Sequence, residues 1–380
     1  MKKILFVVQL PPPVHGAAVM NEIVTGSKLI HQIFEHRTIN ISTSDSIEDI
    51  GKFSLRKIFS MMGTLLTLLR TSRSFRPDLV YLTLSPSGFA FYRDALYVYA
   101  LHFLRKNKPR IIYHLHGKGL RQGVRSSMLF KKISRSIFRD SYVIFLSEKL
   151  ACDGEGLPYK EAFIVNNGFP AKKDPPKTVD TSSARTTKTG KTEGGAPVNI
   201  LYLSNYVRTK GIVDLVDAMA IVARSRQNFH LTLVGKPFDI TIEFLREYTA
   251  EKGLAGKVTI EGPRYGDQKT GLLQEAGIFI LPTYYSNEAF PLSILEAMQY
   301  GIPVISTHEG GIPDIISDGV DGLLFPQRDI QALADRIVFL LDNPEEREKM
   351  GRAAAKKFSE KYTIDTFEGN MLQVLRQVSR

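Results

Sequence analysis

Two glutamates lie in a stretch that is rich in loop-forming residues, from Ser286 to Ile316. Seven residues separate Glu288 from Glu296, and the pair Gly310–Gly311 follows them. A carboxylate is a poor ligand for phosphate but a good acceptor for paired hydroxyl groups such as those of a sugar. These residue types at this spacing therefore favour the binding of sugar hydroxyls.

The elements that must position the two acids are a strand, a helix and a second strand. The apolar run Ala276–Leu281 predicts a buried parallel strand, and a helix is expected from about Pro291 to Tyr300. Gly301 ends that helix, and Val304 begins the next strand, with a short helix after it. Helix N-termini at strand ends favour a phosphate through their free N–H groups and the helix dipole. Phosphate donors beside hydroxyl acceptors indicate a nucleotide-sugar pocket.

The same stretch resembles a known family. Glu288 and Glu296, followed by EAMQYGIPVIST and GGIPDII, are similar to the Glu-x7-Glu signature of retaining glycosyltransferases with the GT-B fold, family 4 (glycosyl transferases group 1). The resemblance implies that Glu288 contacts the donor sugar and Glu296 the ribose. It also implies that the backbone N–H groups of Phe290 and Leu292, on either side of Pro291, hold the diphosphate. The alternative for Glu296 is a helix cap or a solvated surface position.

Composition describes a soluble globular protein with room for two domains. The chain has 380 residues, of which 43% are hydrophobic, and its mean hydropathy is −0.09. The single cysteine, Cys152, excludes an internal disulfide and thiolate metal clusters, and fits the cytosol. The start, MKKILFVVQLPPP, reads as a first strand and loop rather than a signal peptide, and no apolar run approaches a membrane span.

The net charge of +11 is concentrated in the first half of the chain. Residues 1–170 hold 24 Lys and Arg against 12 Asp and Glu, whereas the remainder holds 26 against 27. Such asymmetry predicts an anionic partner. The segments 55–75 and 121–139 interleave basic residues with Phe, Leu and Met, which suits either peripheral attachment to the inner face of an anionic membrane or ordinary core helices. Nucleic acid is not favoured, because no recognised module accompanies the charge.

Strand and helix patterns alternate along the chain, which predicts an α/β protein with parallel sheets covered on both faces. The resemblance implies GT-B, two Rossmann-like doubly wound domains facing a cleft. The boundaries expected are an acceptor-binding domain at 1–170, a flexible linker at 171–196, a nucleotide-sugar domain at 197–363, and a helix at 364–380 that packs back on the first domain. Strands are predicted at 2–8, 37–41, 79–84, 110–116, 142–146, 162–165, 200–203, 230–234, 258–260, 278–281 and from 304.

Candidate residues in the first domain follow its strands. Gly16, in the loop PPPVHGAA, allows close approach to the diphosphate, or simply makes a tight turn. Ser87 and Arg93 follow the third strand and are candidates for acceptor contact, with a plain loop as the alternative. His114 and His116 lie on one side of a strand; by resemblance His116 approaches the donor sugar and the reacting centre. A metal bound to this pair would need a third ligand, and none is evident.

In the second domain, Lys210 and the glycine after it match the end of the family's Gly-Arg-x4-Lys-Gly motif. Asn205 stands where the family has its arginine, and Arg208 is expected to supply the missing charge to the leaving diphosphate. Gly235 follows a strand at the ligand-binding edge, and Tyr265 lies in a loop that could face the nucleotide base.

These residues predict a retaining glycosyltransferase of hexosyl groups that needs neither cofactor nor metal. No Asp-x-Asp motif is present, so Lys210, Arg208, Gly16 and a helix N-terminus must neutralise the leaving group. The donor would be a nucleotide-diphosphate sugar and the acceptor a glycan or polyprenyl-linked lipid, in bacterial surface-polysaccharide synthesis. The alternatives are a GT-B sugar-nucleotide epimerase, a non-catalytic nucleotide-sugar or membrane-surface binding protein, and a nicotinamide-dependent dehydrogenase, for which GxGxxG is lacking.

Overall fold

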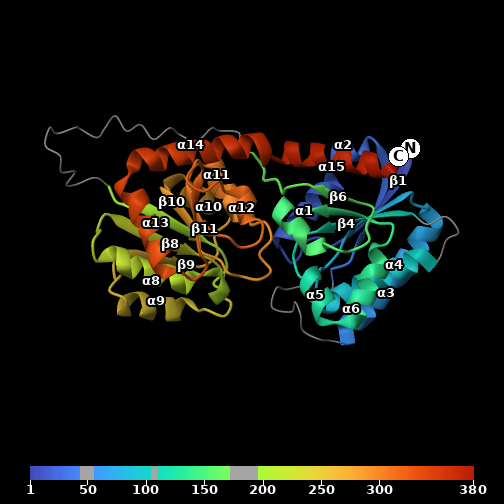
Figure 1. The fold of residues 1–380 in the computed structure, drawn as a ribbon, viewed down its shortest axis with the longest axis horizontal. Coiled ribbons are helices and arrows are strands. Elements are labelled where there is room, and N and C mark those ends of the chain that lie inside the picture. Colours follow the sequence, from blue (N-terminus) through green and yellow to red (C-terminus); the bar gives the residue numbers. More distant parts are fainter. Residues whose placement is uncertain (43–54, 104–108, 172–195) are drawn as a thin grey trace. The chain divides into compact units, whose positions relative to one another are not determined.

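The computed structural model describes residues 1–42, 55–103, 109–171 and 196–380, with the side chains of 55–58 left out. Contacts divide the chain into two units (Figure 1). Unit 1 contains Met1–Gly168 together with Ile364–Arg380, and unit 2 contains Phe169–Thr363. The predicted linker at 171–196 lies almost entirely outside the described residues.

Unit 1 is built on a six-stranded parallel sheet of order β2-β1-β3-β4-β5-β6. Strand β1, between β2 and β3, is apolar and fully buried over Ile4–Val8, as expected for a strand covered on both faces. The strands are β1 (Lys2–Val8), β2 (Phe34–Asn40), β3 (Leu79–Thr83), β4 (Arg110–Leu115), β5 (Tyr142–Phe145) and β6 (Glu161–Ile164).

Helices cover both faces of this sheet. Helices α3, α4 and α6 pack beside one another on one face, and α2 and α15 pack together on the other (Figure 1). Short helices begin at serine caps: Ser27 accepts the N–H of Ile30, and Ser127 that of Phe130. The helices are α1 (Gly16–Gly26), α2 (Lys28–His31), α3 (Leu55–Phe75), α4 (Gly88–Phe103), α5 (Leu120–Ser126), α6 (Met128–Phe138), α7 (Glu148–Ala151) and α15 (Ile364–Ser379).

Unit 2 contains a second six-stranded parallel sheet, of order β12-β11-β10-β7-β8-β9. Helix α8 packs against α13, and α11 packs against α14. The strands are β7 (Val198–Leu203), β8 (Phe229–Val234), β9 (Val258–Glu261), β10 (Ile278–Leu281), β11 (Val304–Thr307) and β12 (Gly322–Phe325). The helices are α8 (Ile212–Ala223), α9 (Ile242–Glu251), α10 (Gly266–Glu275), α11 (Leu292–Gln299), α12 (Ile312–Ile315), α13 (Ile330–Asp342) and α14 (Pro344–Lys361).

The strand order of unit 2 reverses between β7 and β10. The chain passes from β7 outward to β8 and β9, then returns across the sheet to β10 and continues to β11. The loops that follow β7 and β10 therefore leave neighbouring strand ends in different directions. A crevice at such a reversal is where open α/β sheets bind ligands, so the two loops are the natural place for a site.

The predicted strands are found within a few residues of their expected bounds, and the α/β fold class is confirmed. Strand β2 begins at Phe34, earlier than expected, and β12 (Gly322–Phe325) was not predicted. Its four residues are too short to show a period. Helix α11 begins at Leu292, because Pro291 has an extended backbone, with ψ at 118°, and serves as the N-cap.

The last helix, α15, belongs to unit 1. Its C-terminal carbonyl groups accept hydrogen bonds from Lys2 and Arg110, and Gln377 bonds Glu161. These three partners are the first residues of β1, β4 and β6, so this helix end lies at the amino edge of the sheet, away from the ligand-binding edge.

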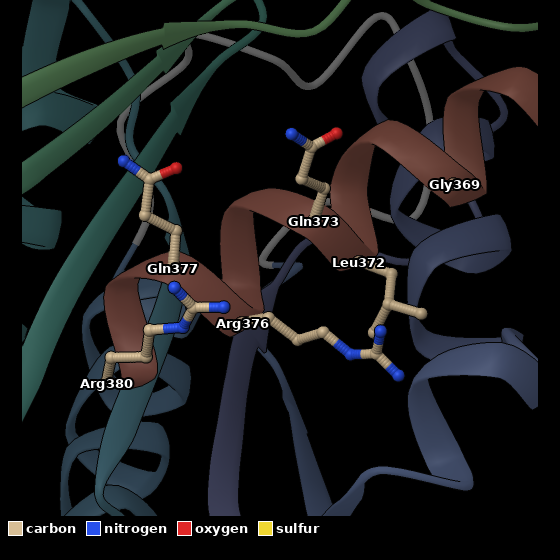
Figure 2. A pocket seen from close by; sticks show the side chains of 6 residues that line it. All are labelled: Gly369, Leu372, Gln373, Arg376, Gln377 and Arg380. Carbon is tan, nitrogen blue, oxygen red and sulfur yellow. The ribbon is translucent and has the colours of Figure 1, made fainter.

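Figure 2 shows the outward side chains of α15 around a hollow of about 470 Å³. Its lining residues come from α15 and the residue directly after it: Gly369, Leu372, Gln373, Arg376, Gln377 and Arg380. With a single wall it is a surface depression rather than a binding pocket. No helix in the described part of the chain is long and apolar enough to cross a membrane.

Replacing a glycine in α14 should reduce stability, whereas replacing one in α15 should not. A Cβ on Gly351 would lie 2.1 Å from the carbonyl oxygen of Gly301, whereas a Cβ on Gly369 would meet nothing within 4 Å. Gly351→Ala should therefore lower the free energy of unfolding by about 1–3 kcal/mol through overpacking. Gly369→Ala should raise it by up to about 1 kcal/mol through helix propensity. Urea unfolding followed by circular dichroism measures both, and equal effects would contradict the packing described.

Candidate active site

The loops after β7 and β10 are in contact because Gly211 has no side chain to separate them. Gly211 has a φ of 79°, and a Cβ at this position would lie 2.1 Å from the carbonyl oxygen of Pro282. The N–H of Tyr284 donates to the carbonyl of Thr209 at 2.8 Å, which joins the same two loops. A larger residue at 211 would push the loops apart.

This contact brings Lys210 and Glu288 together. The ammonium group of Lys210 forms an ion pair with the Glu288 carboxylate, and also lies 4.9 Å from the ring centroid of Tyr285. The two side chains are 18% and 9% exposed. The sequence predicted both residues as catalytic, and the structure places them in direct contact, although they are far apart in the chain.

The loop after β11 holds Glu288 from the other side. Gly310 has a φ of 55°, and a Cβ there would lie 2.1 Å from the Glu288 carbonyl oxygen. Gly311 donates its N–H to the carbonyl of Ala289 at 2.7 Å, and the N–H of Glu288 itself donates to Tyr285 at 2.7 Å. The backbone that carries Glu288 is thus fixed by hydrogen bonds within and between loops.

Helix α11 starts directly behind this loop and has no side-chain cap. Pro291, at the N-cap, has neither an N–H group nor a side-chain oxygen to offer. The first N–H groups of a helix have no acceptor within the helix, so that of Leu292 points to the region before α11 with the positive end of the dipole. Phe290 is buried and packs edge-on against Tyr362, with ring centroids 5.9 Å apart.

Glu296 lies in the middle of α11 and is buried. Lys269 of α10 places its ammonium nitrogen 2.6 Å from Glu296 Oε1. The sequence analysis missed Lys269, because a lone lysine in a polar helix gives no signal of its own. Only the fold brings α10 beside α11. Each glutamate of the pair is therefore matched by a lysine from another element.

Arg208 and Asn205 lie on the same loop as Lys210 and are exposed. The N–H of Arg208 donates to Asp239 Oδ1 at 2.9 Å, and its guanidinium lies 5.8 Å from the ring centroid of Phe244 on α9. The carbonyl of Asn205 accepts from Tyr202 and from the N–H of Val207. Arg208 is thus near the β7 end, but it contacts α9 rather than the Lys210–Glu288 pair.

Gly235 and Tyr265 occupy different environments. A Cβ on Gly235 would lie 1.9 Å from the carbonyl oxygen of Ser204, so this glycine is needed for the β7 and β8 ends to pack. Tyr265 is the N-cap of α10 and its side chain is 72% exposed. Their predicted roles in donor binding stay predictions.

In unit 1, the loop after β1 leads to helix α1, whose first residue is Gly16. His15 is the N-cap, and its Nδ1 accepts the N–H of Ala18 at 3.3 Å. Burial lowers the pKa of His15, which keeps the imidazole neutral and able to accept. The predicted phosphate site at this helix start is therefore already partly satisfied by the protein's own side chain.

His116 follows β4 and packs against His114. Its ring centroid is 4.0 Å from that of His114, which bonds the Tyr81 hydroxyl through Nδ1. Burial, with a smaller effect from His15, lowers the pKa of His116 to about 3. Both of its ring nitrogens are buried without a hydrogen-bond partner among the described residues. Such orphaned atoms are unusual and mark His116 as a candidate functional residue.

The two acceptor candidates differ in accessibility. Ser87 is exposed. Its loop packs against the loop after β4: a Cβ placed on Gly119 would lie only 3.0 Å from the Ser87 Cβ. Arg93 is buried: its Nε donates to Asp94 Oδ1 at 2.9 Å, while Asp94 Oδ2 accepts the N–H of Ser85 at 2.8 Å. In this structure Arg93 stabilises the loop through Asp94, which bonds the loop backbone at Ser85. In the described part of the chain, no three His, Cys, Asp or Glu side chains are placed to share a metal ion.

The buried histidines should make stability depend on pH. Burial lowers the folded-state pKa of His114 and His116, so below pH 6.5 the unfolded chain binds protons that the folded chain does not. The free energy of unfolding should therefore fall with falling pH, by about 1.4 kcal/mol per pH unit for each such histidine. In His116→Asn, urea titrations between pH 7 and 5 should show a slope smaller by about one proton; an unchanged slope would contradict the burial of a neutral His116.

Residues 186–357 match the family model described as glycosyl transferases group 1. The D-inositol 3-phosphate glycosyltransferase of Corynebacterium efficiens is 30% identical over 185 residues, which are 46% of this chain and 43% of that protein. The amylovoran biosynthesis glycosyltransferase AmsK of Erwinia amylovora is 32% identical over 142 residues, 36% of this chain and 34% of that protein. The matched part thus spans less than half the length of these relatives.

A solved structure is similar over the whole chain. Anabaena Alr3699/HepE in complex with UDP superposes with a TM-score of 0.72 over 99% of this chain and 100% of that chain, at 17% identity. At 17% identity this similarity is evidence for the fold only. The two doubly wound sheets are those of the GT-B glycosyltransferase fold, as predicted. The resemblance found in the sequence is confirmed: residues 186–357 match the model of the glycosyl transferases group 1 family.

Proposed function

We propose that this protein is a retaining glycosyltransferase that moves a hexosyl group from a nucleotide-diphosphate sugar to a glycan or lipid-linked acceptor without a metal ion. The observation that carries the proposal is the Lys210–Glu288 ion pair at the strand-order reversal, directly before the uncapped start of α11. At this place the cation and the helix N–H groups suit a phosphate, and the carboxylate suits the hydroxyl groups of an adjoining sugar.

The donor is recognised at both of its ends. Glu288 accepts hydroxyl groups of the sugar, and Glu296 accepts those of the ribose. A carboxylate has about four lone-pair sites, so Glu296 can hold a ribose while Lys269 keeps its contact with Oε1. UDP bound to Alr3699/HepE supports a uridine diphosphate donor as the first to test.

Charge on the leaving diphosphate is neutralised by the protein. As the bond between the anomeric carbon and the phosphate oxygen breaks, negative charge grows on the diphosphate, and Lys210 and the N–H of Leu292 stabilise it. The acceptor oxygen bonds to the anomeric carbon on the face that the diphosphate leaves. Its proton passes to the departing phosphate oxygen, so no separate base is required.

Unit 1 supplies neutral hydrogen-bonding groups. Because the pKa of His116 is lowered to about 3, its imidazole is uncharged at physiological pH and can both donate and accept. Its unpartnered ring nitrogens suit a substrate hydroxyl. Ser87, on the neighbouring loop, is the candidate for acceptor contact. Relatives named for amylovoran biosynthesis and for D-inositol 3-phosphate glycosylation support a polyhydroxylated acceptor, and cytoplasmic surface-polysaccharide synthesis is the proposed setting.

The donor can be identified by thermal shift with nucleoside diphosphates and their sugars, because a bound ligand stabilises the folded chain. The nucleotide that raises Tm most is then supplied as its sugar, with and without acceptor lipid or glycan, in the presence of EDTA. Transfer that survives EDTA supports the proposal. Epimerised sugar nucleotide formed without any acceptor would instead identify an epimerase, and loss of all turnover in EDTA would overturn metal independence.

Replacing Glu288 tests the sugar contact. Glu288→Gln keeps the side-chain shape but leaves Lys210 without its carboxylate, so transfer should fall by about 10²–10³-fold. The Tm shift with nucleoside diphosphate should persist, because the phosphate ligands remain. Glu275→Gln, at the exposed end of α10, is the matched control and should leave transfer unchanged. Near-normal turnover of Glu288→Gln would remove the assigned role.

Replacing Lys269 tests the ribose end of the donor. Lys269→Met leaves the Glu296 carboxylate buried without its cation, so the Kd for the nucleoside diphosphate should rise about tenfold. The Kd for inorganic pyrophosphate, which has no ribose, should not change. Lys269→Arg should restore binding. Equal losses for both ligands would mean that Lys269 serves the fold alone.

A further inference from the structure

Helix α3 exposes large apolar side chains along its outer face. Phe59, Met62 and Leu66 recur at helical spacing, and Phe59 is 75% exposed. Arg70 and Arg73 continue the same stripe toward the end of the helix and are exposed. One side of α3 is therefore apolar over its first half and cationic over its last turns.

Helix α4 contacts both α3 and α6, and it repeats the pattern. Its inner side chains are buried against the sheet, whereas Phe89, Leu96, Tyr99 and Phe103 are exposed. The exposed fraction of Phe103 reaches 91%. Four apolar side chains on one outward stripe of a helix are far more than the scattered single exposures usual on a monomer.

Helix α6 adds both kinds of side chain. Met128 and Leu129 begin it and are exposed, with Met128 at 69%. Lys132, Arg135 and Arg139 follow Met128 at intervals of four, three and four residues, so they share its outward side, and all three are exposed.

No acidic side chain is exposed on the described residues of α3, α4 and α6. Segments 55–75 and 120–139 contain no Asp or Glu at all, and the single acid of α4, Asp94, is buried with Arg93. We call the surface the α3–α4–α6 face, defined by Phe59, Met62, Leu66, Arg70, Arg73, Phe89, Leu96, Tyr99, Phe103, Met128, Leu129, Lys132, Arg135 and Arg139.

The occupant must accept apolar side chains and cations in one layer. A second copy of this chain would bring the same cations against these, which opposes association. A bilayer with anionic headgroups satisfies both, because aromatic and aliphatic side chains enter the acyl boundary while Lys and Arg remain among the phosphates. The positive excess of the first half of the sequence has the matching sign.

We propose that the α3–α4–α6 face docks unit 1 on an anionic lipid bilayer, with Phe59, Phe103 and Met128 inserted at headgroup depth. The proposal deepens the proposed function, on which it rests for its purpose, because docking would hold the enzyme beside a lipid-linked acceptor. Its physical basis is the composition of the face, which is independent of any catalytic residue.

Flotation of the full chain with vesicles tests the docking. Vesicles of phosphatidylcholine alone are compared with vesicles containing 30% phosphatidylglycerol, a fraction chosen at about the level that gives a strong surface potential. The unmodified chain should float with the anionic vesicles and not with the neutral ones. Lys132→Gln/Arg135→Gln/Arg139→Gln should weaken partitioning about 100-fold, since each cation near the surface contributes about 1 kcal/mol.

A second variant isolates the apolar contribution. Phe59→Ser/Phe103→Ser/Met128→Ser keeps every charge and should weaken partitioning at least about tenfold. The matched control is Lys349→Gln/Arg352→Gln/Lys356→Gln on α14, which removes three exposed cations from unit 2 and should float like the unmodified chain. Equal loss in the control, or no loss in the apolar variant, would reduce the binding to unspecific charge attraction and overturn the proposal.

Donor binding is measured separately on the same proteins. The nucleoside diphosphate that stabilises the unmodified chain should raise the Tm of all three variants equally, because none touches the donor site. Flotation without any donor stabilisation would leave the docking face standing and refute the transferase proposal. Stabilisation by the donor without flotation of the unmodified chain would leave the transferase proposal standing and refute the docking face.

Discussion

The candidate site depends on how closely the strand-end loops of unit 2 approach one another. Gly211 lies against Pro282, and Gly310 lies against Glu288, at distances that a Cβ would not allow. These two contacts bring Lys210 to Glu288 and fix the backbone behind the carboxylate. Because the loops belong to β7, β10 and β11, the reversal of strand order determines which side chains can meet.

Pairing both glutamates with lysines has a clear electrostatic reason. Glu288 and Glu296 are both buried, and an uncompensated buried carboxylate is costly. Lys210 and Lys269 offset that cost while leaving lone pairs on each carboxylate for hydroxyl groups. Unit 1 uses the opposite solution at His116, where burial keeps the side chain neutral.

Much of this arrangement could be predicted from sequence. Buried strands such as β1 and β10 are continuous apolar runs, and the spacing of Glu288 and Glu296 within its block identified the family. Other features needed the fold. Lys269 reaches Glu296 only because α10 crosses back beside α11, and β12 is too short to show a period. Arg93 looked available from its position after a strand, yet the tertiary fold buries it against Asp94. Sequence spacing locates residues on an element, but which neighbour they meet is decided by topology.

Helix α15 has a practical consequence for handling this protein. It is the last element of the chain, yet its carbonyl groups bind Lys2 at the very start and Arg110 at the beginning of β4. Truncation after Thr363, or a fusion tag joined directly to Arg380, would therefore disturb the amino-terminal half. Isolating that half for crystallisation or isotope labelling would require splicing 364–380 onto 1–168, since a single proteolytic cut cannot release it intact.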